Sequence, residues 1–361
     1  MRVMIAGGGT GGHVIPALAI AGALKSAYDA EVCFIGTARG METRLVPQAG
    51  YALELIEVGQ LNRVSLATKL KTLVALPRGI LHCLGLLRRW QPHVVVGVGG
   101  YASGPAMLAA LILRVPTLAF EPNAVPGMAN RLIGKRISAA AVNFAPTLAY
   151  FRNAEVTGIP VRTEFFVLAP RPPQSASRLL VMGGSQGARA LNQKMPQIAK
   201  SLLDAVPGLT ILHQAGARHA ETTEAAYAAS GASADRWKVQ AFLEDMPAQF
   251  AASDLILARS GASTVAELAA SGKPSLLVPF PQAADDHQRK NAEVLVEGGA
   301  AVMLLEQDMT EASLLGALTG LLSDPGKLQA MANSARTFAH PRAAARIAEM
   351  VAGLASSPSR L

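Results

Sequence analysis

Residues 3–13 read VMIAGGGTGGH, and residues 179–188 read LLVMGGSQGA. In both stretches a short apolar run, typical of a buried strand, leads into a glycine-rich loop and then into a helical pattern. This order places backbone N–H groups at a helix N-terminus, where they can bind an anion. Because the two loops occupy matching places in the two halves, the sequence predicts a duplicated α/β architecture with a cleft between the halves.

Size and composition favour two α/β domains. The chain has 361 residues, of which 50% are hydrophobic and only 5% aromatic. A single hydrophobic core rarely serves so long a chain, so two domains are expected. With few aromatic residues, the cores must be built from Ala, Val, Leu and Ile, which suits parallel sheets covered by helices.

The chain is basic, with a formal net charge of +8. Such a charge is compatible with three kinds of partner: nucleic acid, an anionic membrane surface or an anionic substrate. The sequence contains no nucleic-acid-binding motif and no basic stripe interleaved with aromatic residues. We therefore expect no nucleic acid partner.

Three features bear on the cellular compartment. Cys33 and Cys83 lie far apart, without metal-ligand or disulfide spacing, which predicts buried free thiols in a reducing cytoplasm. Residues 1–6 lead directly into glycines and lack the long apolar region of a signal peptide. Residues 94–113 contain no charged residue, but glycines and a proline interrupt them. We expect a strand, a loop and a helix there, and no transmembrane helix.

Strand and helix patterns alternate along both halves, which predicts mostly parallel, doubly wound sheets. In the first half, strands are expected at 3–6, 31–35, 53–58, 94–98, 117–121 and 139–142, and helices at 14–27, 43–49, 65–90 (interrupted at Pro77) and 105–113. A Pro-rich segment at 169–175 is the expected linker. In the second half, strands are expected at 179–182, 209–213, 238–241, 255–258, 275–278 and 301–304, and helices at 188–205, 219–229, 246–252, 263–271, 288–297, 311–322, 325–338 and 343–354.

The first glycine loop matches a dinucleotide-binding fingerprint, Gly7-x-Gly9-x-x-Gly12. That fingerprint also requires an acidic residue at the end of the second strand to hold the ribose hydroxyls. The expected second strands end in residues 34–37 (FIGT) and 211–214 (ILHQ), neither of which contains a carboxylate. A nicotinamide-dependent oxidoreductase is therefore a weaker hypothesis, and the Walker pattern for nucleoside triphosphates is absent from both loops.

Several further motifs, in order along most of the chain, resemble the MurG family of bacterial transferases, which add N-acetylglucosamine to lipid I in peptidoglycan synthesis. The matching segments are 7–16 (GGGTGGHVIP), 97–105 (GVGGYASGP), 121–123 (EPN), 158–162 (GIPVR), 183–188 (GGSQGA), 259–268 (RSGASTVAEL) and 278–291 (VPFPQAADDHQRKN). The chain departs from the commoner family pattern at Pro122, where Gln is usual, and at Ile159, where Asn is usual. Both departures concern the acceptor geometry.

The resemblance implies a GT-B fold, which consists of two Rossmann-like domains with doubly wound parallel sheets facing across a cleft. Residues 1–162 would form the domain that faces the acceptor and the membrane, and residues 163–340 the domain that binds UDP-GlcNAc. The last helix, within 341–361, would pack back on the first domain.

The second half carries the expected donor site. Ser185 and the amides of its loop can hold phosphate oxygens at a helix N-terminus, although a tight turn that binds nothing would look alike. Ser263 and Thr264 could cap the next helix and also meet the diphosphate. The resemblance assigns the ribose to Glu267, the uracil to Arg162 and Leu243, and the sugar to Gln288. Otherwise Glu267 would be a solvated side chain, Leu243 a core residue and Gln288 part of a loop. The full expected UDP-GlcNAc set is Thr10, Gly11, Gly12, Asn123, Arg162, Ser185, Leu243, Ala262, Ser263, Thr264, Val265, Ala266, Glu267 and Gln288.

The first half carries the expected catalytic residues. His13 opens a helix, where the helix dipole disfavours imidazolium and so suits a general base, although His13 could equally be a structural residue of the loop. Glu121 is the second candidate acid or base; otherwise it would be a buried carboxylate hydrogen-bonded to loop amides. Tyr101 and Ser103 lie on the expected acceptor side, at the carboxyl end of a strand.

The implied reaction is a single inverting displacement by the C4 hydroxyl of the muramoyl sugar, with helix N-termini stabilising the departing UDP in place of a metal. We expect no cofactor. The partners would be UDP-GlcNAc, lipid I, an anionic membrane surface and other cell-wall synthesis proteins, with peripheral localisation at the cytoplasmic face of the inner membrane. Residues 66–90 alternate leucines with basic residues, as in a helix on a membrane surface or an ordinary amphipathic helix. A UDP-GlcNAc 2-epimerase and a non-catalytic division scaffold are two competing hypotheses for the function.

Overall fold

The computed structural model describes residues 1–57, 66–168, 177–184 and 186–356, with residues 66–75 described by their backbone alone. The chain divides into two compact units. The N-terminal unit comprises Met1–Pro160 with Arg342–Leu361, and the C-terminal unit comprises Val161–Pro341. Arg162 therefore belongs to the second unit. The expected Pro-rich linker, 169–175, lies outside the described residues.

The N-terminal unit is a parallel sheet of seven strands in the order β3-β2-β1-β4-β5-β6-β7. Its strands are β1 (Arg2–Ala6), β2 (Glu31–Gly36), β3 (Ala52–Leu55), β4 (Val94–Gly97), β5 (Thr117–Glu121), β6 (Ala139–Val142) and β7 (Ala154–Val156). Its helices are α1 (Gly11–Tyr28), α2 (Glu42–Gln48), α3 (Leu66–Trp90), α4 (Ser103–Ile112), α5 (Met128–Ile133) and α13 (Ala343–Ser356), with a 3₁₀ turn η1 (Ala145–Tyr150).

The C-terminal unit repeats this plan with six parallel strands in the order β10-β9-β8-β11-β12-β13. Its strands are β8 (Arg178–Met182), β9 (Thr210–Gln214), β10 (Trp237–Gln240), β11 (Leu255–Ala258), β12 (Ser275–Leu277) and β13 (Ala301–Met303). Its helices are α6 (Arg189–Ala205), α7 (Ala220–Ala229), α8 (Met246–Ala251), α9 (Ala262–Ser271), α10 (His287–Glu297), α11 (Glu311–Leu322) and α12 (Pro325–Arg336), with 3₁₀ turns η2 (Thr163–Phe166), η3 (Ala234–Arg236), η4 (Ala284–Asp286) and η5 (Glu306–Asp308).

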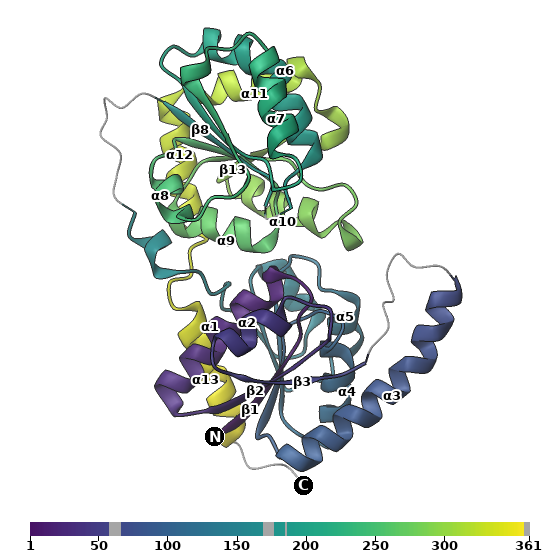
Figure 1. Ribbon diagram of the computed structural model, residues 1–361. Coiled ribbons are helices and arrows are strands. Elements are labelled where there is room, and N and C mark those ends of the chain that lie inside the picture. The colour runs from purple at the N-terminus through teal and green to yellow at the C-terminus, as the bar shows by residue number, and fades with distance from the viewer. Residues whose placement is uncertain (58–65, 169–176, 185, 357–361) are drawn as a thin grey trace. The chain divides into compact units, whose positions relative to one another are not determined.

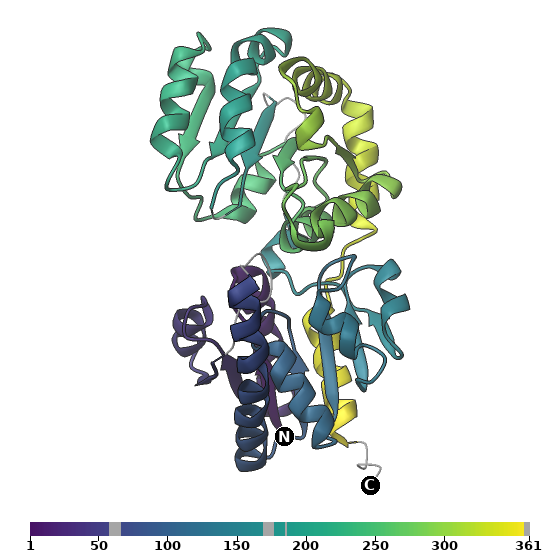
Figure 2. The same cartoon turned by 90° about the vertical axis from the view of Figure 1, so that its right-hand side faces the viewer.

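Both sheets are covered on both faces, as their apolar strands require. In the N-terminal unit, Val3, Met4, Ile5 and Ala6 of β1 are all buried. One face of this sheet packs on α3 and α4, and α1 and α13 lie beside each other on the other face (Figure 1). Figure 2 shows α3 running beside α4. Both cysteines are buried free thiols, as predicted, and burial raises the pKa of Cys33 to about 11.

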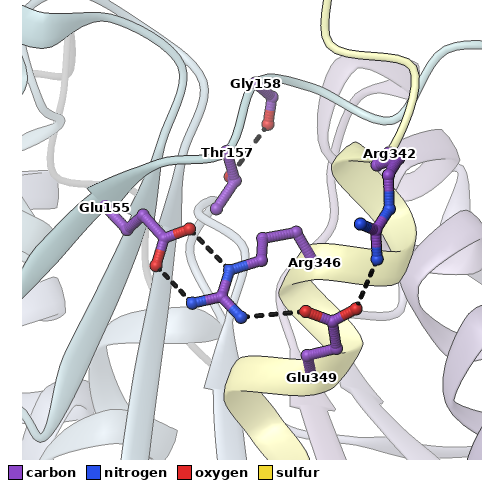
Figure 3. A network of polar contacts seen from close by, with 6 residues as sticks. All are labelled: Glu155, Thr157, Gly158, Arg342, Arg346 and Glu349. Atoms are coloured by element: carbon purple, nitrogen blue, oxygen red, sulfur yellow. Dashed lines mark hydrogen bonds and ion pairs between the residues drawn. The ribbon is translucent and has the colours of Figure 1, made fainter.

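The last helix returns to the N-terminal unit and is tied there by ion pairs (Figure 3). The Arg346 guanidinium binds both carboxylate oxygens of Glu155 on β7, at 2.6 and 2.7 Å. It also donates to Glu349, which accepts a second bond from Arg342. The pairs to Glu155 join positions 191 apart in the sequence, so the last strand of the sheet and the end of the chain stabilise each other.

Three local features differ from the sequence-based expectations. Helix α3 continues through Pro77 without interruption, so the expected break there is wrong. The Pro ring removes one backbone hydrogen bond, which a helix of 25 residues can lose while the remainder of its ladder persists. Strand β7 and helix α5 were not expected, because each is too short to show a periodic apolar pattern. Within the described residues, none of the helices is both long and apolar enough to span a membrane.

Candidate functional site

In each unit the glycine loop lies where the strand order of the sheet reverses. Strand β1 sits between β2 and β4, and β8 sits between β9 and β11. In the N-terminal unit, the loops after β1 and β4 therefore diverge from neighbouring strand ends. The loops after β8 and β11 do the same in the C-terminal unit. Ligand sites of open parallel sheets form at such points.

The N-terminal glycine loop packs against the loop that follows β4. The Gly8 amide donates to the Gly99 carbonyl at 3.3 Å. A Cβ atom on Gly100 would lie 2.4 Å from the Gly8 carbonyl oxygen, and one on Gly7 would lie 2.4 Å from that of Gly99. Only glycines permit this close approach of two backbones.

His13 stands at the junction of these two loops, in the first turn of α1. Its Nδ1 lies 3.4 Å from the Thr10 hydroxyl. A Cβ atom on Gly99 would lie 2.9 Å from the imidazole Cδ2 and Nε2, so the ring packs directly over that glycine. Helix geometry leaves the Gly11 and Gly12 amides of the same turn without intrahelical acceptors. The structure thus brings the predicted residues 10–13 together at the switch point.

Glu121 ends β5 and is 3% exposed. Its Oε1 accepts hydrogen bonds from the backbone and side chain of Asn123, at 3.1 and 3.2 Å, and its Oε2 from the Gly127 amide and Asn130 Nδ2, at 3.0 and 2.9 Å. Burial raises the pKa of Glu121 despite these bonds. Glu121 is thus a buried carboxylate hydrogen-bonded to its own loop, and its role as an acid or base stays a prediction.

The two residues expected on the acceptor side differ in exposure. The Tyr101 side chain is 41% exposed, so it is accessible to a ligand. Ser103 is 1% exposed and packs against Gly97. Among the described atoms, the Ser103 hydroxyl has no hydrogen-bond partner. Tyr101 is therefore the better placed of the two to contact a ligand directly.

The C-terminal unit contains a cavity of about 740 Å³ at its own switch point. The glycine loop after β8, the N-terminal turn of α9 and Gln288 of α10 all contribute to its wall. The lining residues are Met182, Gly183, Gly184, Gln186, Gly187, Ala188, Arg189, Ala190, Gln193, His219, Arg259, Gly261, Thr264, Phe280, Gln282, Gln288 and Glu306. Because helix N-termini favour negative charge, a cavity lined by two of them suits an anionic ligand.

The glycine loop of this cavity is held by the end of β9. Gln214 Nε2 donates to the Gly184 carbonyl at 2.9 Å. Gly187 has φ +75°, and a Cβ atom there would lie 2.0 Å from the Ala215 carbonyl oxygen. Glycine is therefore required at this position. Ser185, the expected phosphate ligand of the loop, lies outside the described residues.

Helix α9 begins one residue before the expected start. Gly261 is its N-cap residue, and no side chain caps it. The expectation that Ser263 or Thr264 caps this helix is therefore wrong, because both already lie in the first helical turn. Thr264 lines the cavity instead. Ala262, Ser263 and Ala266 are half-buried, and Val265 is buried in the core.

Gln288 is fixed at the cavity wall by its neighbours. Its Oε1 accepts from the Phe280 amide at 3.0 Å, and its carbonyl accepts from the Ser260 hydroxyl at 2.8 Å. Asn291, fully buried one turn later, donates to the Ser260 carbonyl. The side chain of Gln288 is thus held in place before any ligand arrives.

Glu267 lies one turn into α9. Burial raises the pKa of its carboxyl to about 7, and the charge of Arg162 opposes that rise. The Arg162 guanidinium in turn lies over the Phe165 ring, 5.2 Å from its centroid. The described residues that line the cavity do not include Glu267, Arg162 or Leu243. Glu267 and Arg162 interact beside η2, and Leu243 is 4% exposed.

Sequence reasoning missed two charged groups that shape these sites. Arg259 and Glu306 form an ion pair of 2.5 Å in the cavity wall, where Arg259 also donates to the carbonyls of Val278 and Pro279. Arg259 directly follows β11, a position at the carboxyl edge of the sheet that could have identified it. Glu42, at the start of α2, is the second. In the described part of the chain, no three His, Cys, Asp or Glu side chains gather as metal ligands.

Two family models match the chain. The model of the glycosyltransferase family 28 N-terminal domain matches residues 3–142, and that of the glycosyltransferase family 28 C-terminal domain matches residues 178–347. A relative from Anaeromyxobacter dehalogenans is 45% identical over 97% of this chain and 92% of its own length, and one from Nitrosococcus oceani is 43% identical over 99% of both. Each is named UDP-N-acetylglucosamine–N-acetylmuramyl-(pentapeptide) pyrophosphoryl-undecaprenol N-acetylglucosamine transferase.

Two solved structures are similar to this chain in fold. MurG of Acinetobacter baumannii is 32% identical, with a TM-score of 0.81 over 98% of this chain and 99% of its own. A UDP-GlcNAc 2-epimerase from Neisseria meningitidis, solved with UDP-GlcNAc, has a TM-score of 0.67 over 98% of this chain and all of its own, at 14% identity. The epimerase shares the fold alone.

Proposed function

Because the chain belongs to glycosyltransferase family 28, we propose that it transfers N-acetylglucosamine from UDP-GlcNAc to the muramoyl sugar of lipid I, which gives lipid II in peptidoglycan synthesis. The relatives that cover nearly the whole chain bear the name of this activity. The two Rossmann-like units constitute the GT-B architecture. The proposal that this chain's own residues bind the donor depends on one observation, the 740 Å³ cavity lined by two helix N-termini in the C-terminal unit.

In this proposal the C-terminal unit holds the donor. The amides of the loop 183–188 and the first turn of α9 bind the diphosphate. The Glu267 carboxylate accepts the ribose hydroxyls, with Arg162 and Leu243 beside the base. Gln288 contacts the sugar from the cavity wall that it lines.

The N-terminal unit supplies the base. The C4 hydroxyl oxygen of the muramoyl sugar attacks C1 of N-acetylglucosamine and inverts it, while the bond from C1 to the UDP oxygen breaks. His13 takes the hydroxyl proton. The charge that develops on UDP is stabilised by helix N-termini and loop amides, so we expect no requirement for a metal. The Gly11 and Gly12 amides, in the same turn as His13, are available to a phosphate group of either substrate.

Peripheral association with an anionic membrane surface would bring the enzyme to its polyprenyl acceptor. In residues 76–90, the part of α3 whose side chains are described, Leu81 is 67% exposed and Arg78, Arg88 and Arg89 are exposed. Cys83, Leu86 and Leu87 of the same helix pack in the core. The side chains of residues 66–75, which carry the rest of the expected basic and apolar pattern, lie outside those described. Co-sedimentation with vesicles containing anionic lipid, against neutral vesicles, tests this association.

The deciding experiment measures transfer of labelled N-acetylglucosamine from UDP-GlcNAc to a lipid I analogue, with and without EDTA. We expect a labelled lipid product in both reactions. No transfer would contradict the proposed reaction, and transfer lost with EDTA and restored by a divalent cation would contradict its metal-independent part. Conversion of UDP-GlcNAc to its 2-epimer without an acceptor would instead favour the epimerase hypothesis.

A further inference from the structure

Glu42 is a buried carboxylate that the proposed reaction does not use. It begins α2, five residues after Thr37, and is 1% exposed. Cβ atoms built on Gly8, Gly36 and Gly40 would each lie within 2.6 Å of its side chain. Three glycines thus make the space that this one side chain fills.

The carboxylate is directed at the catalytic glycine loop. Its Oε2 accepts from the Gly9 amide at 2.7 Å, across 33 positions of sequence. Its Oε1 accepts from the amide and the hydroxyl of Thr37, at 2.9 and 3.0 Å. Although burial acts to raise it, these hydrogen bonds hold the pKa of Glu42 below its usual value, so the group is ionised at neutral pH.

Gly9 is held at both of its backbone polar groups. While its N–H donates to Glu42, its carbonyl accepts from the Met41 amide at 3.3 Å. Its φ is +90°, in the region that favours glycine. The segment 40–42 therefore holds Gly9 from one side, and Gly99 and Gly100 pack on the loop from the other.

The position of His13 depends on this arrangement. Gly9 precedes Thr10, whose carbonyl accepts from the His13 amide and whose hydroxyl lies 3.4 Å from Nδ1. The imidazole packs over Gly99, which is hydrogen-bonded to Gly8. A shift of Gly9 would move the ring relative to Gly99.

We propose that Glu42 is a positioning residue for the transfer reaction, which fixes the glycine loop through Gly9 and thereby sets the place of the His13 imidazole. Glu42 contacts neither substrate in this proposal and acts through the backbone. Its hydrogen bond also occupies the Gly9 amide, so a phosphate group at this loop can meet only the amides that follow. The proposal rests on the proposed function where it concerns turnover.

The test compares Glu42→Gln with the wild-type enzyme and with Glu31→Gln, which replaces an exposed glutamate of β2 in the same sheet. The Gln amide nitrogen cannot accept a hydrogen bond, so either Gly9 or the Thr37 amide loses its partner. We expect kcat to fall on the order of 10- to 100-fold, since small misplacements of a reacting group cost about that much. The KM for UDP-GlcNAc should change by less than kcat does, because the cavity proposed to hold the donor lies in the other unit. Glu31→Gln should behave as wild type.

A second measurement does not depend on turnover. In protein carrying ¹³C-labelled histidine, the His13 signal can be assigned among the seven histidines by its loss in His13→Ala. We expect Glu42→Gln to shift that signal and leave those of the C-terminal unit in place. If Glu42→Gln does not fold, Thr37→Val, which removes only the hydroxyl bond to Glu42, should shift the His13 signal from its wild-type position.

The outcomes separate the two proposals. Wild-type protein without transfer activity would count against the proposed function, while the histidine signal would still decide the role of Glu42. Wild-type transfer with an unchanged kcat in Glu42→Gln, or an unchanged His13 signal in the variant that folds, would overturn the positioning role. A rise in the KM for UDP-GlcNAc equal to the loss in kcat would also overturn it.

Discussion

Replacing Glu267 by Gln should stabilise the C-terminal unit while weakening donor binding. Burial raises the pKa of this carboxyl from 4.5 to about 7. Below pH 4.5 the group is protonated in both the folded and unfolded chain and costs nothing. As the pH rises towards 7 the unfolded chain ionises first, so the free energy of unfolding falls, and the full cost is present above pH 7. The difference between the two pKa values corresponds to at most about 3 kcal/mol.

Chemical denaturation of the two proteins at pH 5 and pH 8 measures this difference. Glu267→Gln should be more stable than wild type by up to about 3 kcal/mol at pH 8 and by less than about 1 kcal/mol at pH 5. Glu297→Gln, at an exposed position of the same unit, is the matched control and should show no pH-dependent gain. Equal gains at both pH values would refute burial as the cause.

Donor binding gives the second half of the test. Because the ionised carboxylate accepts the ribose hydroxyls in the proposed complex, wild-type affinity for UDP-GlcNAc should fall about tenfold for each pH unit below 7. Glu267→Gln should bind weakly and lose this dependence. Calorimetric titration between pH 5.5 and 8 measures both, and wild-type affinity in the variant would refute the ribose assignment.

Contacts elsewhere in the two units give three more predictions. Gly99 has φ +90°, and a Cβ atom there would lie 2.9 Å from the His13 ring. Gly99→Ala should therefore lower kcat more than about tenfold in steady-state kinetics, at unchanged donor affinity. Unaltered turnover would show that the reaction tolerates displacement of the ring. Burial lowers the pKa of His213 to about 3, so wild-type stability should fall by up to about 1.4 kcal/mol per pH unit below 6.5. His213→Gln should flatten that acid-side loss in denaturation curves at pH 4 and 7, and a wild-type slope in the variant would argue against it. Arg346→Ala should lower the Tm through loss of the pair to Glu155, less so in 1 M salt, and a salt-independent drop would indicate lost packing instead.

The glycine loops and the parallel sheets could be predicted from sequence because their signals are local. The runs 3–6 and 179–182 are strand-like in composition, and the glycines after them mark the loops directly. The order of strands within each sheet, which creates the two switch points, is not contained in any such run. It follows from pairings between segments far apart in the chain.

Glu42 shows why part of the site could not be predicted. It lies in a polar segment at a helix start, where a glutamate is ordinarily solvated. Its partner Gly9 is 33 residues away, and only the pairing of β1 with β2 brings the two together. Residues 34–37 at the end of the second strand contain no acid, but the amide and hydroxyl of Thr37 donate to the Glu42 carboxylate. Similarly, the apolar character of Leu243 predicts a core residue, and its side chain is buried.

The hydrogen bonds that hold each glycine loop bear on whether a dinucleotide can bind there. In dinucleotide-binding sheets the group at the end of the second strand faces outward and selects the ribose. Here the Glu42 carboxylate, at the start of α2, accepts from the Gly9 amide, and the Gln214 side chain, at the end of β9, donates to the Gly184 carbonyl. A nicotinamide cofactor at either loop would meet a side chain that already hydrogen-bonds the loop backbone. We therefore expect neither loop to bind a nicotinamide cofactor through its ribose.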